Sequence, residues 1–182
     1  MTVGNSTHDR FTQATVTLGN GAVFQGTSFQ TTGLSSRPLI WSRDAGLGPV
    51  TDSLALCFGA ADGSAALLDP AKVAGKILIC ERWSNALVNK VDNAKAAGAT
   101  GVIILNTPAS ANTAPTISAA LPTVHLTVSA YASLTAYAGT SNPTASFGPG
   151  VQLAGVVAPV MSDSSSRGPN QADPDVLKPD VT

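Results

Sequence analysis

The stretch that decides the fold is GKILICER at residues 75–82, together with AGATGVIILN at residues 97–106. Residues 77–79 form a short apolar run with β-branched side chains, and residues 102–105 form a second one. Runs of this length and composition predict strands rather than helices. Strands without polar alternation are buried on both faces, so this unit should lie at the centre of a domain.

The residues between these two strands predict one amphipathic helix. Ser84 offers a hydroxyl oxygen to the free amides of a first turn, and Gly98 suits the left-handed residue that ends a helix. Apolar residues recur at helical spacing along one side, at Leu87, Val88, Val91 and Ala94. Polar residues fall on the other side and are expected to face solvent, at Asn89, Lys90, Asp92 and Lys95.

The remaining expected elements are short and separated by turn residues. Residues 11–18 and 22–25 flank Gly19-Asn20-Gly21 and predict a β-hairpin. Asp69-Pro70 predicts a capped helical turn. Further strands are expected at residues 39–41, at 124–128 as a half-buried strand, and at 145–147. A helix capped by Ser129 should follow the second of these.

Composition excludes several classes of protein. Hydrophobic residues make up 43% of the 182 residues and charged residues 12%, which is enough apolar material for a core. The net charge of −1 without a basic block argues against nucleic acid and against an anionic membrane surface as partners. No apolar run approaches the roughly 18 residues that would span a bilayer, so no membrane partner is expected.

The central unit resembles the protease-associated (PA) domain. The resemblance rests on Gly75-Lys76-Ile77, on Cys80-x-Arg82 and on the run at residues 97–106. The tail, SSRGPN at 165–170 with LKPDVT at 177–182, is similar to the segment shortly before the nucleophile of subtilisin-like serine proteases (subtilases). The head, TVGNSTHDR at 2–10 with LGNG at 18–21, resembles the subtilase stretch before a PA insertion. The similarity spans nearly the whole chain.

The resemblance implies an α+β class and a β-rich PA-type fold. This fold is an open β-barrel or sandwich of short strands, with two or three flanking helices around a strand-helix-strand core. The implied domains are 1–33 as a flank from the peptidase domain containing the hairpin, 34–148 as the PA domain, and 149–182 as the return segment. Residues 151–160 would then run beside the strand at 11–18. Because the chain opens within an expected strand and residues 1–4 lack a signal-peptide pattern, we expect a piece of a longer protein. The resemblance implies that this longer protein is secreted.

The two cysteines, Cys57 and Cys80, leave two interpretations open. They are consistent with one disulfide or with two buried free thiols, since cysteine also serves as a small apolar residue. The resemblance favours the disulfide, because plant-type subtilases place cysteines at both positions. Such a bond would contribute about 3 kcal/mol on the chain-entropy estimate.

A catalytic set is nearly absent from the sequence. His8 and Asp9 are neighbours whose side chains point to opposite faces of a strand, so they cannot form a nucleophile–base–acid relay. His125 lies in an alternating strand and is expected to be a hydrogen-bonded, partly exposed histidine. Gly26-Thr27-Ser28 matches the subtilase nucleophile triplet, but strand and turn residues follow it. The nucleophile is therefore expected beyond Thr182.

No cofactor and no metal site is predicted. The histidines and cysteines lack the spacing of a zinc site. Two acidic segments, Asp62-Gly63 and Asp173-Pro174-Asp175, could form turns or bind calcium, and the turn interpretation is favoured.

Candidate contact residues follow the two central strands. Arg82 and Trp83 come directly after the first, and arginine and tryptophan dominate binding hot spots. The alternative is that Trp83 folds back on the core while Arg82 makes a local ion pair. Asn106 ends the second strand and either holds a loop or contacts a ligand, the loop role being favoured. The chain departs from the family pattern at Trp83, where many PA domains have glycine, and at Ser164, where an aromatic residue is usual.

The function implied by the resemblance is a non-catalytic PA domain inserted in a secreted subtilisin-like serine endopeptidase. It would modulate the access of protein substrates or mediate protein contacts. The expected partners are protein or peptide substrates of the parent protease and its catalytic domain. Two alternatives are a free-standing α/β domain that binds a small ligand, with several strand-helix-strand units, and a purely structural spacer.

Overall fold

The computed structural model describes residues 11–153. The strands are β1 (Phe11–Leu18), β2 (Val23–Thr27), β3 (Leu34–Trp41), β4 (Ile77–Arg82), β5 (Gly101–Asn106), β6 (Thr123–Leu126), β7 (Thr144–Phe147) and β8 (Val151–Leu153). The helices are α1 (Asp52–Ala55), α2 (Pro70–Val73), α3 (Leu87–Ala96) and α4 (Tyr131–Ala138). Short 3-10 turns are η1 (Ser42–Asp44), η2 (Ala60–Asp62) and η3 (Val128–Ala130).

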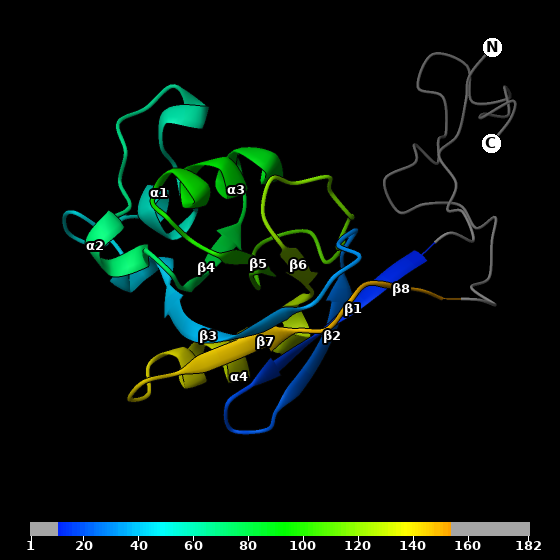
Figure 1. Ribbon diagram of the computed structural model, residues 1–182. Coiled ribbons are helices and arrows are strands. Elements are labelled where there is room, and N and C mark those ends of the chain that lie inside the picture. The colour runs from blue at the N-terminus through cyan, green and yellow to red at the C-terminus, as the bar shows by residue number, and fades with distance from the viewer. Residues whose placement is uncertain (1–10, 154–182) are drawn as a thin grey trace, which may run out of the picture. The chain divides into compact units, whose positions relative to one another are not determined.

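The strands β1 to β7 close into a barrel (Figure 1). Their order around the ring is β2-β6-β5-β4-β3-β7-β1, and pairing of β1 with β2 completes it. The strands β3 to β6 run parallel, whereas β1–β2, β1–β7, β3–β7 and β2–β6 are antiparallel. The β-rich PA-type fold with short flanking helices is confirmed, and the structure specifies the barrel as closed.

The junctions of the ring differ in length. Six residue pairs join β4 and β5, from Ile77–Gly101 to Arg82–Asn106. A single pair, Thr27 with His125, joins β2 and β6. A Cβ on Gly26 would lie 2.4 Å from the backbone oxygen of His125, so only glycine allows the two strands to approach this closely.

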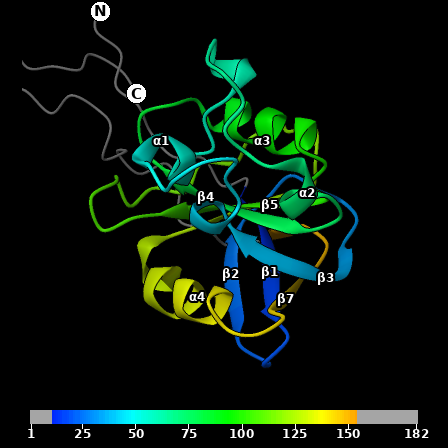
Figure 2. The same cartoon turned by 90° about the vertical axis from the view of Figure 1, so that its left-hand side faces the viewer.

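The central strands β4 and β5 face two cores, because successive side chains of a strand point to opposite faces. One core is shared with the other strands of the ring and with α4, and the other lies between the strands and α3; Figure 2 shows these helices on opposite sides. Side chains of the first core in these strands are Ile77, Ile79, Ile103 and Leu105. Those of the second are Leu78, Cys80, Val102 and Ile104. This arrangement explains why neither strand alternates with polar residues.

The helix α3 is present but begins later and is rotated from the expected position. Its N-cap is Ala86 without a side-chain hydrogen bond, so the prediction that Ser84 caps it was wrong. Val88 is 41% exposed and Lys90 is fully buried, which reverses the expected places of these two residues. Asp92 and Lys95 are exposed as predicted. Gly98 follows with a φ of 85°, the left-handed conformation expected at this position.

Other elements follow the sequence closely. The hairpin β1–β2 forms with Gly21 at a φ of 87°, and the Asp69 side chain caps α2 by accepting a hydrogen bond from the Ala71 amide. The strand expected to be half-buried is β6. All of its residues are buried, because β6 is a strand of the ring with β5 on one side and β2 on the other. Ser129 lies in η3 rather than at the cap of α4, whose N-cap is Ala130.

The domain boundaries after residues 33 and 148 stay predictions. Residues 12–151 form one compact unit, and the hairpin belongs to its barrel. Most of the return segment, including residues 154–160, Ser164 and the tail motifs, lies outside the described residues, as do His8 and the head motif at residues 2–10.

Candidate functional site

Polar side chains gather at one edge of the barrel, where the parallel strands end. The carboxyl ends of parallel strands meet at the same edge of a sheet, and this is where α/β proteins commonly place ligands. Arg82 ends β4 and lies in register with Asn106 at the end of β5. Arg43 follows the end of β3, and Glu81 precedes Arg82 in β4. Four charged or amide side chains are thereby brought together from distant parts of the sequence.

The first group at this edge holds the loop of residues 107–122. Nη1 of Arg82 donates to the backbone oxygen of Ala111 at 3.1 Å, to the Thr113 hydroxyl at 3.2 Å and to the Thr113 backbone oxygen. Nδ2 of Asn106 donates to that same Thr113 oxygen at 3.0 Å. Nη1 also lies 3.4 Å from Oδ1 of Asn106. Asn106 is completely buried, so its bonds act inside the protein rather than on a ligand.

His125 completes this group from β6. Its Nε2 lies 2.8 Å from Oδ1 of Asn106, and its Nδ1 lies 3.1 Å from the backbone oxygen of Pro115. It is hydrogen-bonded as predicted but only 1% exposed, so the expected partial exposure was wrong. Burial lowers the pKa of His125 to about 4, with the nearby charge of Arg82 acting in the same direction. The ring is therefore neutral at physiological pH and serves to hold the loop.

An ion pair occupies the neighbouring part of the edge. Nε and Nη2 of Arg43 donate to the two carboxylate oxygens of Glu81 at 2.7 and 2.9 Å, a bidentate arrangement. The guanidinium also lies 5.4 Å from the centre of the Trp41 ring. The hydrogen bond to Glu81 raises the pKa of Arg43. The local ion pair considered for Arg82 thus belongs to Arg43 instead.

A surface hollow adjoins these groups. It has a volume of about 230 Å³ and is lined by Arg43, Asp52, Ala55, Leu56, Glu81, Arg82, Trp83, Thr107 and Ala109. Trp83 is 57% exposed at its rim, so this ring does not fold back on the core. We call this feature the Trp83 hollow. It combines an exposed aromatic ring with two guanidinium groups.

A second polar group lies beneath α3. Nζ of Lys90 donates to the backbone oxygen of Leu56 at 2.9 Å and to Oδ1 of Asn85. Asp62 accepts from the side-chain amides of Asn85 at 3.3 Å, Asn89 at 2.9 Å and Asn93 at 2.7 Å. Burial lowers the pKa of Lys90 to about 8, and the negative charge of Asp62 opposes this. The group fastens residues 56–62 to the helix.

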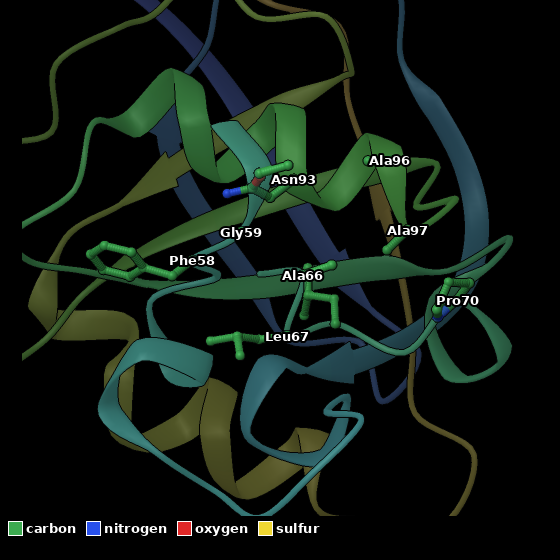
Figure 3. Close-up of a pocket in the computed structure, with 10 residues that line it drawn as sticks. Phe58, Gly59, Ala66, Leu67, Pro70, Asn93, Ala96 and Ala97 are labelled. Atoms are coloured by element: carbon green, nitrogen blue, oxygen red, sulfur yellow. The ribbon is translucent and has the colours of Figure 1, made fainter. Parts of the chain in front are cut away.

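An apolar pocket of about 80 Å³ lies between α3 and the segment that precedes α2 (Figure 3). Phe58, Leu67 and Pro70 line one side, and Ala96 at the end of α3 and its C-cap Ala97 line the other. No charged residue lines it, so it offers no group for acid–base chemistry.

Neither Ser28 nor the acidic residues form reactive sites in the described part of the chain. Ser28 is buried, and its hydroxyl donates to the backbone oxygen of Thr123 at 2.7 Å. Across residues 11–153, no group of three or more His, Cys, Asp or Glu could hold a metal ion.

The sulfur atoms of Cys57 and Cys80 are bonded, which confirms the disulfide over the free thiols. Within residues 11–153, no helix is long and apolar enough to cross a membrane.

Comparison with known families and proteins identifies the domain. The family model described as the PA domain matches residues 46–134. The chain contains a PA domain. Over its whole length it is homologous to plant subtilisin-like proteases: it is 40% identical over 194 residues to subtilisin-like protease SBT5.4 and 37% identical over 188 residues to SBT1.7, both of Arabidopsis thaliana. These alignments cover 100% and 99% of this chain but 23% of each relative, so the chain spans about a quarter of their length.

A solved structure resembles the same fold. The crystal structure of the psychrophilic subtilisin-like protease Apa1, from the Antarctic psychrotroph Pseudoalteromonas sp. AS-11, superposes with a TM-score of 0.50 at 16% identity. The match covers 80% of this chain and 36% of that one. At this level of identity the likeness concerns the fold of the PA domain alone.

The sequence identified part of what the PA domain brings together at this edge. Arg82 and Asn106 meet directly, whereas Trp83 lies on the surface beside Arg82. Their role in contacting a partner stays a prediction. Arg43 was not predicted from the sequence. A signal was available, because Arg43 directly follows the strand expected at residues 39–41 and residues after that strand reach the same edge. The buried pairing of His125 with Asn106 had no signal in the local sequence pattern.

Proposed function

We propose that this PA domain is the non-catalytic part of a secreted subtilisin-like endopeptidase and governs which protein substrates or protein partners reach it. The observation that carries the proposal is the similarity to subtilisin-like proteases along the whole chain. The surface at the Trp83 hollow supports a docking role, because tryptophan and arginine supply most of the binding energy in protein interfaces. Secretion is supported by the disulfide, which persists in oxidising compartments.

The chemistry of the described residues supports a non-catalytic role. A serine nucleophile needs a base within hydrogen-bond reach, and the Ser28 hydroxyl donates to a backbone oxygen instead. His125 is neutral and buried, and its two nitrogens face Asn106 and Pro115. The group at the edge of the barrel therefore orders a loop.

The parallel strands β3 to β6 are the feature that favoured a small-ligand α/β domain. These strands belong to a closed barrel that antiparallel strands complete, and α3 is the helix of ten residues between two of them. At their carboxyl ends, Arg82, Asn106 and His125 bond to the protein's own loop of residues 107–122. Docking of a protein is therefore the better proposal.

Two measurements on the purified chain test this function. Incubation with casein and with a serine-reactive phosphonate probe should give neither hydrolysis nor labelling. Calorimetric titration with unfolded casein should give saturable binding that weakens in Trp83→Ala, with the exposed Val23→Ala as the matched control. Hydrolysis that disappears in Ser28→Ala would refute the non-catalytic role. Absence of saturable binding would refute docking and leave the domain as a spacer.

A further inference from the structure

We propose that the Trp83 hollow recognises a carboxylate side chain of a protein or peptide partner, with Arg82 binding the carboxylate and the indole ring of Trp83 contacting the residue beside it. The inference rests on the proposed docking function and names the chemistry that the surface selects. It assigns Arg82 a second role in addition to its hold on the loop.

The distribution of charge around the hollow points to an anionic ligand group. Four charged residues line it: Arg43, Asp52, Glu81 and Arg82. Glu81 forms an ion pair with Arg43, and the charge of Asp52 also acts on Arg43. Both carboxylates therefore balance the positive charge of Arg43. No carboxylate within the described residues contacts Arg82, and burial lowers its pKa without any opposing acid. The positive charge of Arg82 is thus the unmatched one.

The hydrogen bonds of Arg82 leave the correct donors available. A guanidinium carries five N–H donors, and its Nε and Nη2 form a fork that matches a carboxylate. In the described part of the chain, the contacts of Arg82 are all made by Nη1. Arg43 shows the matching geometry in the same hollow, because its Nε and Nη2 hold both oxygens of Glu81.

The size and walls of the hollow fit a side chain rather than a cofactor. Its volume of about 230 Å³ is below the roughly 300–1,000 Å³ of typical small-molecule sites. Ala55 and Leu56 form an apolar wall and Trp83 forms an exposed rim. A carboxylate on Arg82 would place an adjacent apolar residue of the partner against this ring. The expected ligand is therefore an aspartate or glutamate beside an apolar residue.

The test uses pools of C-terminally amidated decapeptides that are random in their uncharged residues. One pool has a fixed central glutamate and the other has glutamine. We expect the immobilised chain to bind the glutamate pool about tenfold more tightly at low salt, the lower end for a charge-assisted hydrogen bond at a partly exposed site. Arg82→Gln and Trp83→Ala should remove this preference, and Arg37→Gln, at an exposed arginine of β3, should retain it.

A further variant separates recognition from the loop. Arg82→Gln also removes the bonds to residues 111 and 113, whereas Asp52→Asn leaves them in place and removes a negative charge from the hollow. Asp52→Asn should strengthen binding of the glutamate pool and leave the glutamine pool unchanged.

The possible results are distinguishable. Equal binding of both pools that depends on Trp83 would overturn carboxylate recognition while the docking function stands. Binding of neither pool would overturn both. A third pool has the central glutamine and a free C-terminal carboxylate, and binding of this pool as tight as that of the glutamate pool would assign Arg82 to chain ends and overturn the side-chain proposal.

Discussion

Lowering the pH from 7 to 4 is expected to remove about 3 kcal/mol from the free energy of unfolding through His125 alone. The ordinary pKa of histidine is 6.5, and that of the buried His125 is about 4. Each pKa unit corresponds to 1.36 kcal/mol, which gives about 3 kcal/mol for this difference. Between these two values the unfolded chain binds more protons than the folded one, so acid favours unfolding. The loss should develop as the pH falls below 6.5 and level off near 4.

The assay is urea unfolding followed by tryptophan fluorescence at a series of pH values, on the natural chain and on His125→Gln. The two proteins share every other titratable group, so the difference between their curves isolates His125. The variant should be less stable at pH 7, because the buried contacts of the ring with Asn106 and Pro115 are disturbed, but it should lose less stability in acid. Parallel curves from pH 7 to 4 would refute the reasoning that burial holds this ring neutral.

Three further predictions concern the groups around the barrel. The pKa of Lys90 is lowered from 10.5 to about 8, so the unfolded state binds more protons than the folded state between these two values. The free energy of unfolding, measured with urea, should therefore rise between pH 8 and 10 in the natural chain but not in Lys90→Met. Replacing both Cys57 and Cys80 by alanine should cost about 3 kcal/mol, since the bond closes a loop with a sequence separation of 23, and the midpoint of thermal unfolding will report it. Asn106→Ala should cost about 1–3 kcal/mol and speed amide hydrogen exchange in residues 107–122 more than in β4, whereas uniform exchange would contradict the loop-holding role.

The strands were predictable because their signals are local. Residues 77–79 and 102–105 are continuous apolar runs, and the structure buries both on two faces. Gly21 and Asp69 likewise act through their immediate neighbours in the sequence.

The rotation of α3 was not predictable from its own residues. Lys90 is buried because it meets the backbone oxygen of Leu56, which is 34 residues away. Asn93 is buried for the same kind of reason, since it bonds to the backbone of Cys57 and to Asp62. Periodicity assigns polar residues to solvent unless a distant partner satisfies them, and those partners become neighbours only through the tertiary fold.

The candidate site was predictable to a similar extent. Arg82 and Asn106 were placed correctly at the ends of adjacent strands, because parallel strands align their ends. The partner of Glu81 was not, since Arg43 reaches it across β3 and β4 from 38 residues away. The neutral state of His125 also depends on burial that its short strand did not indicate.

The single residue pair between β2 and β6 has a consequence for local opening of the barrel. Within the described residues, the strands β1 to β7 pair with neighbours on both sides, which reduces the edges that another chain could extend. The strands β2 and β6 share one residue pair and the hydrogen bond from the Ser28 hydroxyl to the Thr123 backbone oxygen, so we expect the ring to separate first at this junction. His125 belongs to this pair, so the acidity that protonates its ring should also favour local opening of the barrel between β2 and β6.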